Sequence, residues 1–212
     1  MLKNTLNSIS PLDGRYATKL RDLEQHFSEF ALIKNRVLVE INWLIFMSRT
    51  KSLRFIPALS KNKETSLLKI INEFSVKDAE QIKKIEAKTN HDVKAVEIFI
   101  GKKLESLNLK KYSEFVHLFC TSEDINNLSY NLMLKGYLDN EFKEINSLLL
   151  KDLKSKSKKW SKLSMLSFTH GQTASPTTLG KEIANFHERI KYHLNLLKFL
   201  NPSGKFNGAV GN

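Results

Sequence analysis

The feature that most constrains this chain is a run of apolar residues at three- and four-residue steps that begins after Ser28. Because an α-helix turns once in about 3.6 residues, this spacing puts the apolar side chains on one face of a long amphipathic helix. They are Phe30, Ile33, Val37, Ile41, Leu44 and Ile45. The chain has only 4 Pro and 8 Gly in 212 residues, and no strand-like alternation recurs. The sequence therefore predicts a fold dominated by helices.

Polar breaks separate the other expected helices. The stretch SVKD at 75–78 is typical of a capping box, which opens a helix. The helices expected after the first one cover 61–74, 75–88, 93–107, 122–163 with a kink near Gly136, and 178–200. The breaks are TNHD (89–92), TSED (121–124) and THGQT (169–173). Residues 166–176 are expected to be irregular or extended, because Pro176 and its small polar neighbours disfavour a helix.

Composition narrows the class of protein. The net charge is +12, but the lysines are dispersed among acids and form no arginine-rich arm, so nucleic-acid binding is a secondary hypothesis. A diffuse positive field also suits a small polyanionic substrate. No apolar run approaches the roughly 20 residues of a membrane helix, and the N-terminus lacks the apolar core of a signal peptide. With Cys120 as the single cysteine, we expect no internal disulfide, a cytoplasmic protein and no membrane partner.

Each polar break has a structural and a functional interpretation. Thr121 or Ser122 can cap the following helix, yet two hydroxyls at a helix N-terminus also form a seat for a carboxylate or phosphate. The adjacent acids argue against an anion there unless they point away. In TNHD, Asp92 can cap a helix and His91 can be a surface residue, or Asn90, His91 and Asp92 can together contact one ligand.

The break around His170 is the strongest candidate for chemistry. Gly171 allows a sharp turn, while Thr169 and Gln172 offer hydrogen bonds beside an imidazole that can move a proton. A metal site is not expected, because the pair His117 and Cys120 has no second pair with ligand spacing. Cys120 is more simply interpreted as a small buried residue than as a nucleophile.

Five segments taken together resemble the adenylosuccinate lyase family of the fumarase/aspartase superfamily. They are ISPLDGRY (9–16), IEAKTNHDVKAVE (85–97), SEFVHLFCTSEDINNLSYNLMLK (113–135), THGQTASPTTLGKEIAN (169–185) and GKFNGAVGN (204–212). The resemblance implies an all-α, fumarase/aspartase-like fold and a homotetramer. It implies an N-terminal helical domain over 1–110 and the first part of a central long-helix bundle over 111–212.

The resemblance also implies a carbon–nitrogen lyase of the amidine-lyase type, working without cofactor or metal. Fumarate would leave adenylosuccinate, giving AMP, and would likewise leave the succinyl-carboxamide imidazole ribotide of purine synthesis. By motif, His170 would be the general acid, with Thr169 and Gln172 in support. The residues implied in nucleotide-substrate binding are Arg15, Tyr16, Asn90, His91, Asp92, Thr121 and Ser122.

The resemblance is incomplete in one respect. The family's catalytic base is a serine on a loop of the type SSxMPxKxNP, and these 212 residues contain no such motif. We therefore expect the chain to be a fragment that is inactive by itself. The alternatives are a non-catalytic helical remnant and a basic helical module that binds nucleic acid.

Overall fold

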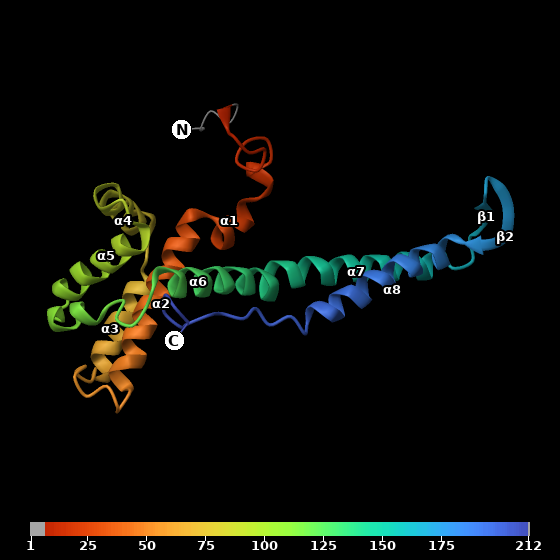
Figure 1. Ribbon diagram of the computed structural model, residues 1–212. Helices are drawn as coiled ribbons and strands as arrows, with labels where there is room; N and C mark the ends of the chain where they lie inside the picture. Colours follow the sequence, from red (N-terminus) through yellow and green to blue (C-terminus); the bar gives the residue numbers. More distant parts are fainter. Residues whose placement is uncertain (1–6, 212) are drawn as a thin grey trace. The chain divides into compact units, whose positions relative to one another are not determined.

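A computed structural model describes residues 7–211, and helices dominate it (Figure 1). The elements in chain order are η2 (Ala17–Lys19), α1 (Arg21–Phe27), α2 (Glu29–Arg49), α3 (Lys61–Asn72), α4 (Val76–Thr89), α5 (Asp92–Ser106), η3 (Lys110–Phe115), α6 (Ser122–Tyr137), η4 (Leu138–Phe142), α7 (Lys143–Lys159), β1 (Ser164–Thr169), β2 (Gln172–Thr178) and α8 (Leu179–Leu197). The predicted helical fold class is confirmed, apart from one short hairpin.

The described residues divide into two compact units. The first holds residues up to 136 together with the segment from 203 onward, and the second holds 137–202. This division follows contacts within the chain, and the domain boundary at 110 stays a prediction about the complete fold. Within residues 7–211, no helix combines the length and the apolar character needed to cross a membrane.

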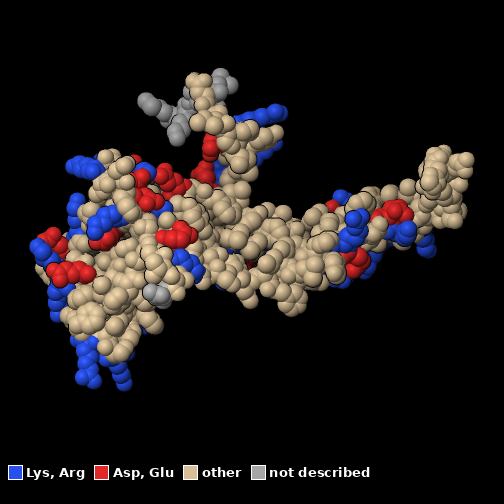
Figure 2. Space-filling view, viewed as in Figure 1, with Lys and Arg blue, Asp and Glu red and all other residues tan. Residues whose placement is uncertain are grey.

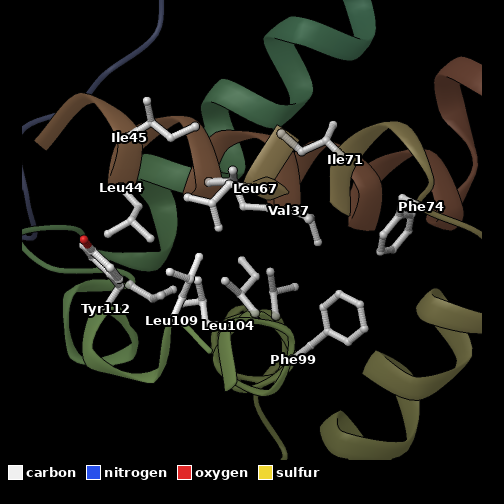
Figure 3. Close-up of a cluster of buried hydrophobic side chains, with 14 of the residues drawn as sticks. Val37, Leu44, Ile45, Leu67, Ile71, Phe74, Phe99, Leu104, Leu109 and Tyr112 are labelled. Atoms are coloured by element: carbon white, nitrogen blue, oxygen red, sulfur yellow. The ribbon is translucent and has the colours of Figure 1, made fainter. Parts of the chain in front are cut away.

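The hydrophobic core of the first unit is built around α2 (Figure 3). The apolar face predicted from the spacing is confirmed, because Val37, Ile41 and Leu44 have no exposed surface. Phe99 and Leu104 of α5 pack in the same cluster. Full burial of such a side chain contributes about 1.5–3 kcal/mol, so this cluster is the main source of stability for the unit.

Helix starts in this unit follow the expected capping chemistry. The hydroxyl of Ser28 accepts the N–H of Ala31 at 3.1 Å at the start of α2. The predicted capping box at 75–78 is confirmed, since the carboxylate of Asp78 accepts the backbone N–H of Ser75 at 3.0 Å. These bonds satisfy donors that have no partner within the first helical turn.

In the second unit, α7 and α8 lie side by side and are joined by the hairpin β1–β2 (Figure 1). The expectation of an irregular or extended stretch is confirmed in its extended form. The pairing of its two halves as antiparallel strands was not predicted. Pro176 is tolerated because a two-stranded ribbon has only edge strands. No residue of α7 is buried within the chain.

The helix expected over 122–163 is interrupted where a kink was predicted. The α-helical pattern stops at Tyr137, next to Gly136, and a π-helical turn, η4, leads into α7. Single π-turns of this kind commonly bend helices. A π-turn is therefore present at the predicted position, and the kink itself stays a prediction.

Candidate functional site

The segment Asn90–Asp92 connects α4 to α5 and lines an open pocket. Asn90 ends α4 in the left-handed region, with φ of 51°. His91 caps α5, because its Nδ1 accepts the backbone N–H of Lys94 at 3.1 Å. The interpretation of Asp92 as the cap was therefore wrong. All three residues line a pocket of about 530 Å³ together with Lys83 and Glu86, so their polar groups can reach one ligand.

Asp92 is held by an arginine that the sequence analysis did not identify. Arg36 of α2 is only 6% exposed and its guanidinium pairs with the carboxylate of Asp92. Burial acts to raise the pKa of Asp92, but the N–H of Val93 and the charge of Arg36 outweigh it and lower that pKa. Asp92 therefore stays ionised near neutral pH and cannot act there as an acid.

Thr121 and Ser122 stand at the start of α6, and each is half-buried. Within the described residues, neither hydroxyl forms a hydrogen bond, so both are available to a ligand. Neither of the adjacent acids forms a hydrogen bond with these hydroxyls among the described residues. Glu123 is exposed, and the buried carboxylate of Asp124 turns to the segment 203–208. The sequence set the condition that these acids point away. It is met only in part, because the carboxylate of Asp124 leaves both hydroxyls unbonded but accepts the backbone N–H of Thr121 at 2.8 Å.

Asp124 anchors the segment 203–208 on α6. Its carboxylate accepts the ammonium of Lys205 at 2.8 Å and the backbone N–H groups of Asn207 and Gly208 at 3.0 and 3.2 Å. It also accepts the N–H of Thr121 at 2.8 Å. Burial acts to raise the pKa of Asp124, but Lys205 and the backbone donors outweigh it and lower that pKa. The carboxylate thus links the hydroxyl pair to the glycine-bearing loop.

The amide of Asn127 completes this attachment. It donates to the carbonyl of Lys205 at 2.9 Å and accepts the N–H of Lys205 at 2.7 Å. Phe206 packs on Trp43 of α2, with ring centroids 4.4 Å apart. The attachment of this segment was not predicted, and its sequence signal is the spacing of Asp124, Asn127 and Asn131 along one face of α6.

The loop before Thr121 is unusual in its backbone. His117 and Phe119 both have left-handed conformations, with φ of 63° and 65°. The Nδ1 of His117 lies 2.6 Å from the buried carboxylate of Glu40. The hydrogen bond to Glu40 raises the pKa of His117, against a lowering by burial. This histidine is therefore held by a carboxylate and belongs to the polar interior of the first unit.

Cys120 in the same loop is a poor nucleophile. Burial raises the pKa of its thiol to about 12, with Glu40 and Asp124 adding to the effect. The thiolate is the reactive form, so a nucleophilic role is disfavoured, although Cys120 is half-buried and not fully buried as the sequence interpretation had it. Among residues 7–211, no group of three or more His, Cys, Asp or Glu side chains is placed to hold a metal ion.

Arg15 and Tyr16 lie together in the turn before η2. The guanidinium carbon of Arg15 is 5.4 Å from the centre of the Tyr16 ring, and both side chains are exposed. The turn is closed by the N–H of Tyr16, which donates to the carbonyl of Pro11 at 3.0 Å. The guanidinium N–H donors of an arginine next to a tyrosine hydroxyl are suited to bind a phosphate group.

His170 occupies the turn of the hairpin in the second unit. His170 and Gly171 have φ of 51° and 75°, and two positive values in succession are typical of a type I′ turn. Thr169 and Gln172 face each other across the turn. All four residues are exposed. Residues 163–180 contain no Lys, Arg, Asp or Glu, and the hairpin is uniformly uncharged in Figure 2.

The structure therefore brings some predicted residues together. In the first unit, Arg36 joins Asp92 to Asn126 of α6, four residues after Ser122. The segments that carry Asn90–Asp92 and Thr121–Ser122 are thus held in one network. Arg15 and Tyr16 contact each other. His170, Thr169 and Gln172 share the hairpin turn of the second unit.

Known proteins match the chain over nearly its whole length. The chain matches a family model described as "Lyase" over residues 14–212. It is 44% identical over 213 residues to an adenylosuccinate lyase of Haemophilus influenzae, a match that covers 100% of this chain and 47% of the relative. It is 42% identical over 210 residues to the adenylosuccinate lyase of Escherichia coli, covering 99% and 46%. The chain spans about half the length of the curated relatives it matches.

Solved structures share the fold. A fumarate lyase from Mesorhizobium matches with a TM-score of 0.68 at 17% identity, over 91% of this chain and 42% of that one. A 3-carboxy-cis,cis-muconate lactonizing enzyme from Pseudomonas putida matches with a TM-score of 0.69 at 18% identity, over 91% and 42%. At these identities the likeness establishes the helical architecture.

Proposed function

The chain belongs to the lyase family, and from this premise we propose that it supplies the substrate-binding residues and the general acid of an adenylosuccinate lyase. The reaction is a β-elimination that releases fumarate from adenylosuccinate, leaving AMP, and from the succinyl-carboxamide imidazole ribotide. The observation that carries the proposal is the pair of available hydroxyls, Thr121 and Ser122, at the N-terminus of α6. A helix N-terminus and hydroxyl donors together favour a carboxylate.

The chemistry requires two proton transfers and binding of a polyanion. A base takes the proton next to a carboxylate, the C–N bond breaks, and an acid gives a proton to the leaving nitrogen. Thr121 and Ser122 bind a carboxylate of the succinyl group, and Arg15 binds the phosphate. Asn90 and His91 contact the substrate from the pocket between α4 and α5. Oriented donors of this kind stabilise charge that develops in the transition state.

His170 is the proposed acid, supported by its position at an exposed and uncharged turn. An imidazole at a hairpin tip can enter a site built by other parts of the enzyme. We propose that the enzyme is a cytoplasmic homotetramer and that neighbouring subunits complete the site. The base lies on a serine loop with no counterpart in these 212 residues. Thr169 and Gln172 support the imidazole by holding the two ends of the turn.

A chimera tests this function directly. Residues 1–212 are joined to the part of the Haemophilus influenzae relative that the match leaves uncovered, and loss of adenylosuccinate is followed by absorbance. We expect the chimera to be active and the 212-residue chain to be inactive. In the chimera, His170→Ala should lower kcat on the order of 100-fold or more with KM little changed. A soluble, correctly assembled chimera without activity contradicts the proposal and favours a non-catalytic remnant.

A further inference from the structure

One face of α2 carries polar groups at three successive turns, on two buried side chains and on the half-buried Trp43. Arg36 is 6% exposed and Glu40 is 0% exposed, and Trp43 follows one turn later. We call these three residues the polar stripe of α2. A buried charge is costly unless it is paired and hydrogen-bonded, so the partners of these side chains show what the stripe is for. Each partner belongs to a segment that carries, or directly precedes, proposed substrate-binding residues.

Arg36 connects two of these segments with one guanidinium group. Its Nε donates to the side-chain oxygen of Asn126 at 2.8 Å, and its Nη2 pairs with Asp92. The planar fork of an arginine fixes both partners in direction as well as distance. The start of α5 and the second turn of α6 are thereby tied to the same point on α2.

Glu40 and Trp43 hold the third segment, the loop 116–121. One carboxylate oxygen of Glu40 accepts the backbone N–H of His117 at 3.1 Å, and the other lies 2.6 Å from Nδ1 of the same residue. The indole N–H of Trp43 donates to the carbonyl of Leu118 at 2.8 Å. Three bonds from α2 thus fall on two successive residues of this loop.

This loop needs such support because of its backbone. Left-handed conformations are unfavourable for residues with a Cβ, and both His117 and Phe119 adopt them. Such strained backbone conformations persist where contacts with the surrounding structure enforce them, often next to functional sites. Thr121 follows Phe119 by two residues, so any relaxation of the loop changes where the hydroxyls of Thr121 and Ser122 point.

We propose that the polar stripe of α2, with Glu40 at its centre, positions the loop 116–121 so that Thr121 and Ser122 are presented to a carboxylate of the substrate. The identity of that ligand rests on the proposed function. Glu40 touches no substrate in this assignment. It acts through the loop, as a positioning residue, and Arg36 does the same for Asn90–Asp92.

The first test measures the loop in the 212-residue chain by hydrogen–deuterium exchange and mass spectrometry. Glu40→Gln should accelerate exchange of the peptide amides over 116–122, and Trp43→Phe should do so to a smaller extent. The matched control is Glu29→Gln on the same helix, because Glu29 is exposed and its ion pair is with Lys83, far from the loop 116–121 in sequence. Unchanged exchange over 116–122 in both stripe variants overturns the positioning role.

The second test uses the active chimera and separates positioning from simple loss of folded protein. In Glu40→Gln, misplaced hydroxyls should raise KM and the inhibition constant of fumarate on the order of 10-fold. A purely structural role would lower the apparent kcat with KM unchanged. If the two residues act as one unit, Glu40→Gln should add little to the KM of Ser122→Ala. Unaltered KM, or full additivity with Ser122→Ala, contradicts the inference.

The two tests fail independently. An inactive unsubstituted chimera refutes the proposed function, while the exchange measurement still decides whether Glu40 positions the loop. Should Glu40→Gln prevent the chimera from folding, Trp43→Phe takes its place in both assays. That substitution keeps an aromatic ring, removes the bond to Leu118 and reduces the ring surface that packs on Phe206, so we expect a KM increase of about threefold.

Discussion

Replacing Asp124 by asparagine is the perturbation whose size the structure defines best. The carboxylate has no exposed surface and accepts hydrogen bonds from Thr121, Lys205, Asn207 and Gly208. Asparagine keeps one acceptor oxygen, but it turns an NH₂ group toward donors that then have no acceptor. Breaking a buried ion pair by removing one partner typically lowers the free energy of unfolding by about 3–5 kcal/mol.

The separate contacts help to place the loss within that range. A hydrogen bond to a charged group contributes about 1.5–3 kcal/mol, and two of the four are lost. The side chain of Lys205 is 37% exposed, so solvent screens its part of the interaction to about 1 kcal/mol or less. The backbone donors therefore dominate, and we expect a loss of about 3 kcal/mol. This corresponds to a roughly 100-fold increase in opening of the segment 203–208.

Hydrogen–deuterium exchange of the peptide that covers 203–211 measures this opening. Glu123→Gln is the matched control, one residue away on the same helix turn and exposed. The folded state lowers the pKa of Asp124. The stabilisation that its carboxylate gives to the segment 203–208 is therefore complete above the unfolded carboxyl pKa of about 3.9. It is lost as the pH falls through the lower pKa of the folded state. Equal protection in Asp124→Asn and Glu123→Gln refutes this reasoning.

Three further predictions follow from other parts of the chain. Gly180→Ala should lower the free energy of unfolding by about 1–3 kcal/mol, because a Cβ there would lie 2.6 Å from the backbone nitrogen of Ser161. In the control Gly101→Ala the nearest atom is 3.9 Å from the new Cβ, so urea unfolding should show no loss of stability. Cys120 is half-buried and has a thiol pKa of about 12, so it should resist alkylation at pH 8 until urea unfolds the chain. Rapid labelling of folded protein would contradict the raised pKa. Duplex DNA should bind weakly and without sequence preference at physiological salt, because lysines and acids are interspersed on the surface in Figure 2. Sub-micromolar, sequence-selective binding would favour the hypothesis of a nucleic-acid-binding module.

The elements that the sequence predicted are those whose signals are local. The periodicity of Val37, Ile41 and Leu44 predicted the core face of α2, and SVKD predicted the start of α4. The hairpin was missed as a paired structure because both of its strands are largely exposed. Such strands need no alternation of apolar and polar residues, which is the usual sequence signal for a strand.

The hydrogen-bond network of Arg36 and Glu40 was not predicted, for a different reason. Arg36 and Glu40 are one helical turn apart, a spacing that on most helices indicates a solvated face. Their partners are Asn126 and His117, 90 and 77 residues away in sequence. No local pattern can reveal that such charges are buried. The proposed ligand residues were found by motif, whereas the residues that hold them became visible only in the structure.

The exposed helices of the second unit have a consequence for the lifetime of the chain in a cell. No residue of α7 is buried within the chain, and Ile145, Leu148, Phe186 and Tyr192 are each more than half exposed. In a copy without packing partners, local unfolding of 137–202 therefore requires little free energy, and proteases cleave chains in such locally unfolded states. We expect limited proteolysis to cut there first. Under the proposed assembly into a homotetramer, such turnover would remove unassembled copies, and the steady-state amount of protein would report how much of it has assembled.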